Sequence, residues 1–387
     1  MRRFTAGFIM LLVAVSFGFA QGTQKVPASE KKEITIANIR WDMGDIAFNG
    51  DQYGTEMYLK EFEKNTGIKV KMLTFGSNNP IEQRKAAEAY FSRGIDGMLL
   101  SSINPPAVVP IVQEANKRNI PVVTHDSMVP GGKQISVFPL AVSAGEEVGQ
   151  AILDKIVALK GDEYLKEKGG HIIELRGMVT LGVDIQRYKG WRNVLEPFLA
   201  KYPKVTVATH VAEFNAAKAR KIVDASISRY GDTILGIFSI DGTMGVGGAI
   251  PALKSAGLFF PKDDPRRIPV GTIDGTSEEF EAVRRGDLDF MIDNGKLTQG
   301  DLAARTLLKW ILEGWDAMPK PGEPLFPEVV SCRQPFTVID GQLQDPPFEG
   351  YVYSFENLLI PVEEPADSKE GWGNAYFKAL NGKWPWE

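Results

Sequence analysis

From residue 34 onward, short β-branched runs alternate with longer stretches in which apolar residues recur three and four positions apart. The first cycle consists of a run at 34–39, a helical pattern at 54–65 and a second run at 68–73. The short runs predict strands and the longer stretches predict helices. Strands that alternate with helices form parallel sheets whose two faces are covered by the helices. The sequence therefore predicts an α/β fold.

The alternation continues through residue 273 and divides into two similar series near residue 143. The first series adds helices at 80–92 and 107–118 and strands at 97–100 and 120–124. The second series has helices at 145–159, 185–201, 216–230 and 244–256, and strands at 171–175, 205–210, 235–238 and 270–273. We expect two doubly wound parallel-sheet domains joined by a three-strand hinge, with crossings near residues 143, 294 and 335.

These crossings define the expected domain boundaries. The first lobe is expected to contain residues 33–142 plus 295–335, and the second lobe residues 143–294 plus 336–387. The tail beyond Met318 is rich in proline and aromatic residues, which predicts loops and short strands that wrap the hinge or one domain.

The first residues have the character of an export signal. Met1-Arg2-Arg3 precedes an apolar stretch at 8–19, which ends in the small-x-small sequence Gly18-Phe19-Ala20. Signal peptides have an apolar middle of about 7 to 15 residues, whereas a membrane span needs about 20. We expect residues 1–20 to be a signal peptide, cleaved after Ala20, and residues 21–32 to be a linker. An uncleaved membrane anchor is the alternative.

The cysteine content bears on the compartment. The single cysteine, Cys332, lies far from the expected cleavage point and cannot form an intrachain disulfide. We therefore expect no lipid tether and no disulfide, and a protein that is free in a periplasm.

Composition excludes one class of partner. The 387 residues are 43% hydrophobic and 24% charged, with a formal net charge of −5, which is typical of a soluble globular protein of about two domains. Nucleic acid binding requires clustered lysine and arginine, which this charge balance does not support.

Polar and aromatic side chains follow almost every predicted strand. Ligands of open parallel sheets bind beyond the carboxyl ends of the strands. The candidate ligand-binding residues are Trp41, Asp45, Phe48, Asn104, Asp126, Arg187, Phe214, Asp241, Asp274 and Asn294. Sugar hydroxyls donate to carboxylates and accept from amides and guanidinium groups, while the apolar face of the ring packs on an aromatic plane. The pattern therefore predicts a sugar site.

Each candidate also has a purely structural interpretation. Asp241-Gly242 and Asp274-Gly275 are turn dipeptides that often cap helices. Trp41, Phe48 and Phe214 are also compatible with packing in a core or an interface. The convergence of many such groups on one sheet edge in both halves favours the ligand site.

Other chemistry has little support in the sequence. His125, His171 and His210 are far apart, so we expect no metal site. The chain contains no HExxH or GxSxG motif, and the glycines at 242–248 lack the dinucleotide-binding spacing. We expect no cofactor and no enzymatic activity.

Several segments of the chain resemble the ribose- and galactose-type periplasmic binding proteins over residues 33–315. The most specific segment runs from Asn78-Asn79-Pro80 through Ile103-Asn104-Pro105 to NIPVVTHD at 119–126. Further matches are IELRG at 173–177, QRYKGW at 186–191, Phe214-Asn215, DGTM at 241–244 and IDGT at 273–276. The resemblance implies the type I periplasmic binding fold and the substrate-binding component of an ATP-binding cassette (ABC) transporter.

The resemblance also implies roles for individual residues. Asp126 would accept sugar hydroxyl donors, Arg187 would lie over the ring oxygen or a neighbouring hydroxyl, and Phe214 would stack on the ring. Three other candidates align with family positions: Asp274 with an Asp, Asn294 near a Gln, and Phe48 with the aromatic residue of the first loop.

Departures from the family indicate the class of ligand. Ser127 stands where the family has an arginine after the strand-four Asp, and Asp45 and Asp241 stand where it commonly has Asn. A pocket rich in acceptors suits a ligand with many hydroxyl donors and no negative charge, such as a pentose, a hexose or a cyclic polyol like inositol.

The expected mechanism is hinge closure around a small sugar or polyol, followed by delivery to the membrane permease of an ABC transporter. An exported sensor that reports to a chemoreceptor or kinase is the main alternative. A transcription regulator of this fold would carry a DNA-binding segment where this chain has an export signal. A glycoside-acting enzyme that uses Asp241 and Asp274 is a weaker alternative, because these carboxyls lie among hydrogen-bonding groups. A monomer is the default state.

Overall fold

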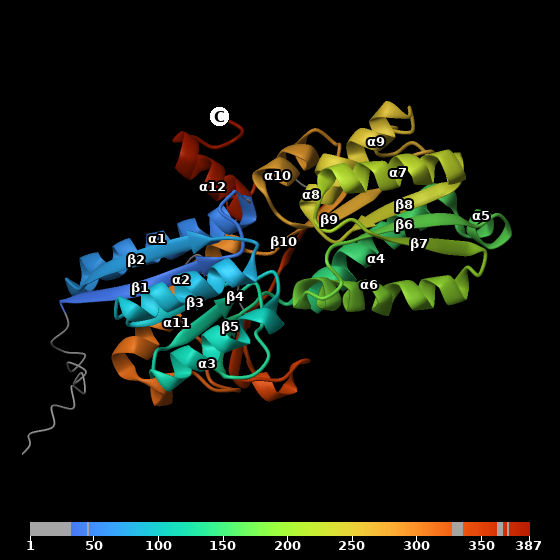
Figure 1. Ribbon diagram of the computed structural model, residues 1–387. Coiled ribbons are helices and arrows are strands. Elements are labelled where there is room, and N and C mark those ends of the chain that lie inside the picture. Colours follow the sequence, from blue (N-terminus) through green and yellow to red (C-terminus); the bar gives the residue numbers. More distant parts are fainter. Residues whose placement is uncertain (1–31, 45, 327–335, 362–366, 370) are drawn as a thin grey trace, which may run out of the picture.

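The computed structural model of this protein describes residues 32–44, 46–326, 336–361, 367–369 and 371–387. The expected signal peptide, most of the expected linker, Asp45 and Cys332 lie outside the described residues. Two α/β lobes lie side by side, and the chain passes between them near β10 (Figure 1). The predicted α/β fold class with two parallel-dominated sheets is confirmed.

The sheet of the first lobe has seven strands in the order β11-β12-β5-β4-β3-β1-β2, all parallel except for β11. Its strands are β1 (Glu33–Arg40), β2 (Lys69–Gly76), β3 (Gly97–Leu100), β4 (Val122–His125), β5 (Lys133–Val137), β11 (Phe336–Asp340) and β12 (Glu349–Phe355). Its helices are α1 (Ile46–Thr66), α2 (Pro80–Ser92), α3 (Val109–Lys117) and α11 (Lys296–Glu313).

Alternation along β1 explains the two layers of helices. Ile34 and Ile36 are buried with α1 and α11 on one face, whereas Ala37 and Ile39 are buried with α2 and α3 on the other. Gly300 of α11 leaves no room for a Cβ against the backbone of α1, which allows these two helices to pack closely.

The sheet of the second lobe has six strands in the order β13-β10-β9-β8-β6-β7, with only β13 antiparallel to its neighbour. Its strands are β6 (Gly170–Arg176), β7 (Val205–Val211), β8 (Ile234–Ser239), β9 (Val270–Asp274), β10 (Phe290–Asp293) and β13 (Leu358–Pro361). The helices that follow or flank them are α4 (Ala141–Lys160), α5 (Asp162–Glu167), α6 (Gly182–Lys201), α7 (Ala216–Tyr230), α8 (Gly242–Met244), α9 (Ile250–Ser255), α10 (Ser277–Arg284) and α12 (Trp372–Asn381).

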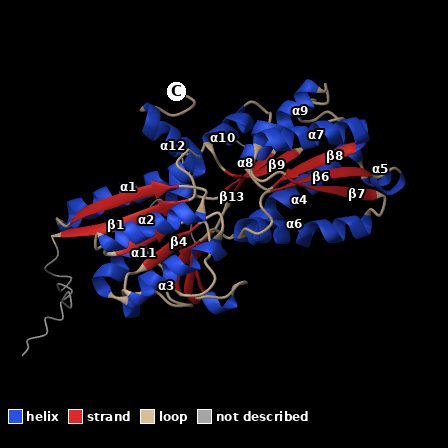
Figure 2. Ribbon diagram, in the orientation of Figure 1, coloured by secondary structure: helices blue, strands red, loops and turns tan. Residues whose placement is uncertain are grey.

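Figure 2 shows helices on both faces of this second sheet, with α4 and α6 on one side and α7 and α9 on the other. One continuous apolar core joins these layers, and Trp191 stacks on Phe238 within it at 4.6 Å between ring centroids. Among the described residues, no helix is both long enough and apolar enough to span a membrane.

The tail differs from its expected place. We expected residues 336–387 in the second lobe, with the third crossing near residue 335. In the structure, β12 pairs with β5 and extends the first sheet, and only β13 joins the second, so this crossing lies between β12 and β13. Tyr353 and Phe355 explain the difference, because both side chains are fully buried in the core of the first lobe.

Candidate ligand-binding site

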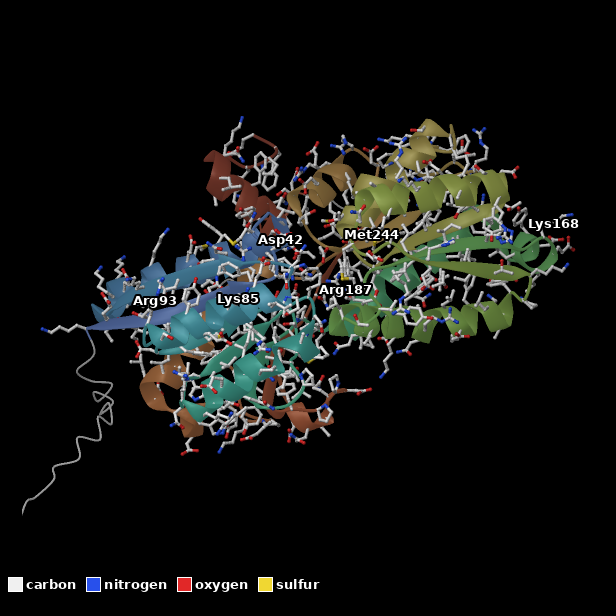
Figure 3. All side chains as sticks on the ribbon, in the orientation of Figure 1. Asp42, Lys85, Arg93, Lys168, Arg187 and Met244 are labelled. Carbon is white, nitrogen blue, oxygen red and sulfur yellow. The ribbon has the colours of Figure 1, made fainter. Side chains whose placement is uncertain are left out.

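A cavity of about 300 Å³ lies between the lobes, beyond the carboxyl ends of the parallel strands. This volume is at the lower end of the range for small-molecule sites. Residues from both lobes line it, and Figure 3 shows Arg187 and Asp42 at the junction of the lobes. The principal lining residues are Trp41, Phe48, Asp126, Arg187, Phe214, Asp241, Asp274 and Lys296.

The acidic residues occupy this edge because each comes where a strand ends. Asp126 directly follows β4, Asp274 is the last residue of β9, and Asp241 follows β8 as the N-cap of α8. Asp241 is therefore a helix cap whose side chain also lines the cavity: one carboxylate oxygen accepts from the backbone N–H of Met244 at 2.9 Å.

Three lining residues, Asp126, Glu213 and Phe214, have an unusual backbone conformation. Asp126 has φ 56° and Phe214 has φ 55°, in the left-handed region that aspartate tolerates and that is rare for an aromatic residue. Such conformations concentrate at functional sites. The Phe214 ring also packs directly on Gly177, where no Cβ fits, so the ring is fixed from behind.

The aromatic residues bring the two lobes into contact. The ring centroid of Trp41 lies 5.3 Å from that of Phe48 in the first lobe and 5.9 Å from that of Phe214 in the second. Met128 packs with Leu181 and Val183 in the same apolar cluster. The lobes therefore meet across the cleft, with apolar ring surface on both sides.

Arg187 is the principal cation of the second-lobe side. Its side chain is 3% exposed and donates to the carbonyl oxygen of Ile240 at 2.8 Å and to Oδ1 of Asp274 at 2.9 Å. Asn294 donates to the same carboxylate oxygen at 3.1 Å. Asp274 is thus held by two side chains, in a fixed orientation toward the cavity.

Asp241, Asp274 and Glu279 are carboxyl groups that influence one another's charge on this side of the cavity. Burial, together with the charge of Asp274, raises the pKa of Asp241 well above its usual range. Burial, and then the charge of Asp274, also raise the pKa of Glu279 to about 7, although hydrogen bonds from Thr272 and Thr276 act to lower it. A protonated Asp241 is able to donate a hydrogen bond as well as accept one.

Lys296 is a site residue that the sequence interpretation missed. It begins α11, is almost fully buried, and places Nζ 2.6 Å from Oδ1 of Asp126 and 3.1 Å from Oε1 of Gln299. Burial raises the pKa of Asp126, but the charge and hydrogen bond of Lys296 more than offset this and hold it below its usual value. The sequence contained one signal for a cation of this kind. Because Ser127 stands where the family has an arginine, Asp126 needs a positively charged partner from elsewhere in the chain.

Most of the predicted residues come together in the cavity, and two of those that the structure describes do not line it. Asn294 is buried and contacts the cavity only through its hydrogen bond to Asp274. Asn104 is exposed and caps the short helix Pro105–Val108 by accepting from the backbone N–H of Ala107, because an asparagine before Pro-Pro is a favoured N-cap. Asp45 lies outside the described residues. Further lining residues that we did not predict include Asn78, Thr243 and Thr276.

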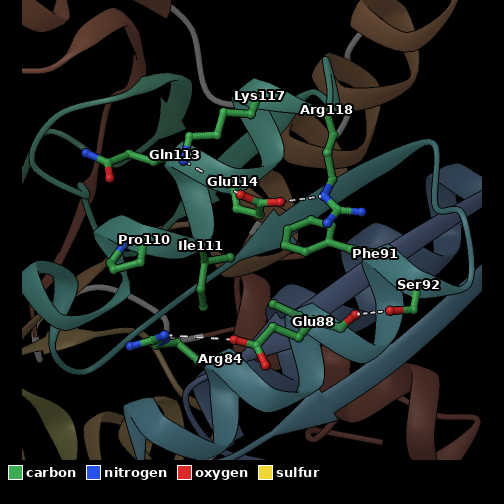
Figure 4. A pocket seen from close by; sticks show the side chains of 11 residues that line it. Arg84, Glu88, Phe91, Ser92, Pro110, Ile111, Gln113, Glu114, Lys117 and Arg118 are labelled. Atoms are coloured by element: carbon green, nitrogen blue, oxygen red, sulfur yellow. Dashed lines mark hydrogen bonds and ion pairs between the residues drawn. The ribbon is translucent and has the colours of Figure 1, made fainter.

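A second hollow, of about 380 Å³, lies between α2 and α3 on the first lobe, away from the cleft (Figure 4). Its charged side chains pair with each other, as Arg84 does with Glu88 and Arg118 with Glu114. Such exposed pairs are typical of a solvated surface. Within the described residues, no group of three or more His, Cys, Asp or Glu side chains is arranged to hold a metal ion.

Comparisons with known proteins agree with this architecture. The profile of the family described as "Periplasmic binding protein domain" matches residues 46–313. A ribose import binding protein of Bacillus subtilis is 26% identical over 250 residues, which are 64% of this chain and 75% of that protein.

Two solved structures share the fold at low sequence identity. The periplasmic binding protein of the arabinose ABC transporter from Shewanella sp. ANA-3, bound to L-arabinofuranose, has a TM-score of 0.66 at 19% identity, and the match covers 90% of this chain and 98% of that one. The Caulobacter myo-inositol binding protein, bound to myo-inositol, has a TM-score of 0.62 at 17% identity, covering 89% and 98%.

Proposed function

Since the chain belongs to the periplasmic binding protein family, we propose that it binds a monosaccharide or cyclic polyol between its lobes and delivers it to the membrane permease of an ABC transporter. The proposal includes export, with removal of residues 1–20, and residence in the periplasm. It assigns a binding function and no catalysis to the carboxyl groups of the cleft.

One observation carries the proposal: both lobes line a single small cavity with oriented carboxylates, two buried cations and aromatic rings. Asp126 and Asp274 supply acceptors, and Arg187 and Lys296 supply donors, which matches the paired donor and acceptor character of sugar hydroxyls. Trp41 and Phe214 offer ring surface for the apolar face of a sugar.

The charge balance supports a neutral ligand. Asp126 pairs with Lys296 and Asp274 pairs with Arg187, which leaves Asp241 as a further carboxyl group in the cavity. An anionic ligand would meet two cations that are each already paired with a carboxylate, and the described residues that line the cavity include no further lysine or arginine for it. The sugars and inositol that relatives and structural neighbours bind are neutral polyols of the proposed class.

The test is a thermal-shift screen of the chain from residue 21 against D-ribose, D-galactose, D-allose, L-arabinose and myo-inositol. A ligand at a hundred times its Kd stabilises the folded state by about 2.7 kcal/mol, which raises Tm by a few degrees. We expect at least one of these compounds to do so.

Asp126→Asn is the matched site variant, because asparagine keeps the shape and also tolerates the left-handed backbone of residue 126. It is expected to weaken binding at least about tenfold, through loss of a charge-assisted acceptor. Asp263→Asn, on an exposed loop of the second lobe, is the control and should bind as the wild type does. A panel in which no sugar or polyol shifts the wild type would contradict the proposal.

A further inference from the structure

The C-terminal helix α12 contacts both lobes. It lies beside α1 of the first lobe and next to α10 of the second, above the junction (Figure 1). On the second-lobe side, Asn374 accepts a hydrogen bond from Nη2 of Arg284 in α10, and Gly373 lies against the backbone of Gly275 and Thr276. On the first-lobe side, Tyr376 meets Tyr53 edge to face, at 5.8 Å between ring centroids.

Trp372, the first residue of α12, makes the contacts closest to the ligand site. Its backbone N–H donates to Oδ2 of Asp293 at 2.9 Å, at the end of β10 where the chain crosses between the lobes. Its indole N–H donates to the backbone carbonyl oxygen of Asp274 at 2.6 Å. Its ring packs on Gly50 of α1, so closely that a Cβ at residue 50 would overlap the ring.

These contacts link the ligand site to the arrangement of the lobes. Asp274 lines the cavity with its side chain while its backbone is held by Trp372, which is 2% exposed. The indole is bonded to the second lobe and packed against the first. If the lobes rotate apart, the contact with Gly50 is lost, and the apolar ring surface becomes exposed to water.

We propose that Trp372 is a positioning residue that fixes Asp274 in the ligand site and stabilises the closed arrangement of the lobes. The inference rests on the proposed function, because Asp274 requires positioning only if the cleft binds a ligand. It gives the C-terminal extension a role: α12 makes sugar affinity depend on a contact made outside the cavity.

Two variants test this link from opposite sides. Trp372→Phe keeps an aromatic ring and removes the N–H that donates to Asp274. Gly50→Ala leaves Trp372 intact and pushes on its ring from the first lobe, while alanine favours helix α1 more than glycine does. Trp384→Phe is the matched control, because the Trp384 ring stacks on Trp386 beyond the end of α12.

Calorimetry and stopped-flow dissociation with D-ribose, L-arabinose and myo-inositol give the first readout. We expect both variants to raise Kd about tenfold, mainly through faster dissociation, and the control to leave it unchanged. The Tm of the sugar-free protein is measured in parallel. A loss of affinity without an equal loss of sugar-free stability separates positioning from a merely structural role.

Small-angle X-ray scattering without sugar gives a readout that does not depend on the ligand. The variants are expected to have a larger radius of gyration than the wild type, since opening is favoured. If no compound of the five-member thermal-shift panel binds the wild type, the proposed function fails and scattering alone decides the inference. An unchanged Kd in both variants would overturn the inference. If no probe binds, scattering identical to that of the wild type would overturn it.

Discussion

Replacing Arg187 with methionine is expected to destabilise the sugar-free protein by about 3–5 kcal/mol and to abolish sugar binding. The buried guanidinium donates to the carbonyl oxygen of Ile240 and to the carboxylate of Asp274. Methionine occupies a similar volume but leaves the carbonyl without its donor and the carboxylate without its cation. Urea unfolding of the sugar-free variant at pH 7 measures the loss.

The size of this loss is expected to depend on pH. The charge of Arg187 is one of the factors that lower the pKa of Asp241, against the stronger effects of burial and of Asp274. Without Arg187 the pKa of Asp241 rises further, and the folded variant holds its proton more tightly than the unfolded chain does. The stability of the variant therefore continues to fall to a higher pH than that of the wild type, so the loss should be larger at pH 8 than at pH 5.

Two further variants separate charge from geometry. Arg187→Lys keeps the charge without the planar pair of donors and should lose less stability than Arg187→Met. Adding Asp274→Asn to Arg187→Met removes the carboxylate that lost its partner, and should recover part of the stability. A double variant no more stable than Arg187→Met, with a loss that does not change between pH 5 and 8, would show that the carboxylates do not interact as described.

The sequence was sufficient where local order determines position. Asp126 and Asp274 stand at the ends of strands, and the carboxyl ends of parallel strands meet at one edge, so their place in the cavity follows from the strand pattern. Arg187 was a candidate from its place in the chain beyond Gly177, but its role over the sugar ring came only from the family resemblance, because a residue within a helix gains its position from the packing of α6.

The sequence was insufficient where local and tertiary interactions compete or where only tertiary packing decides. Asn104 follows a strand as predicted, but the two prolines after it favour a helix start, and its side chain serves as the cap. Lys296 reaches Asp126 only because the chain returns to the first lobe after β10. The contacts of Trp372 with Asp274 and Gly50 join residues that are far apart in the chain, and no periodicity predicts them.

Glu279 is expected to cause a second large dependence of stability on pH, in this case in the wild-type protein. It lies beneath the site in α10, where it accepts hydrogen bonds from Oγ1 of Thr272 at 2.6 Å and from the backbone N–H of Thr276 at 2.8 Å. Burial first, and then the charge of Asp274, raises its pKa from 4.5 to about 7. The folded protein therefore binds this proton more tightly than the unfolded chain, so the free energy of unfolding falls as pH rises from about 4.5 to about 7.

Glu279→Gln is expected to remove this part of the pH dependence. Glutamine retains the shape, the acceptor for the N–H of Thr276 and a group that hydrogen-bonds the hydroxyl of Thr272, but it does not ionise. Relative to the wild type, the variant should gain about 3 kcal/mol of stability between pH 4.5 and pH 8, as measured by urea unfolding across that range. Glu278→Gln, at the exposed neighbouring position of α10, is the control and should run parallel to the wild type. If the Glu279→Gln curve also runs parallel, then Glu279 ionises at its ordinary pH in the folded protein, and the charge of Asp274 is not felt at the buried end of this network.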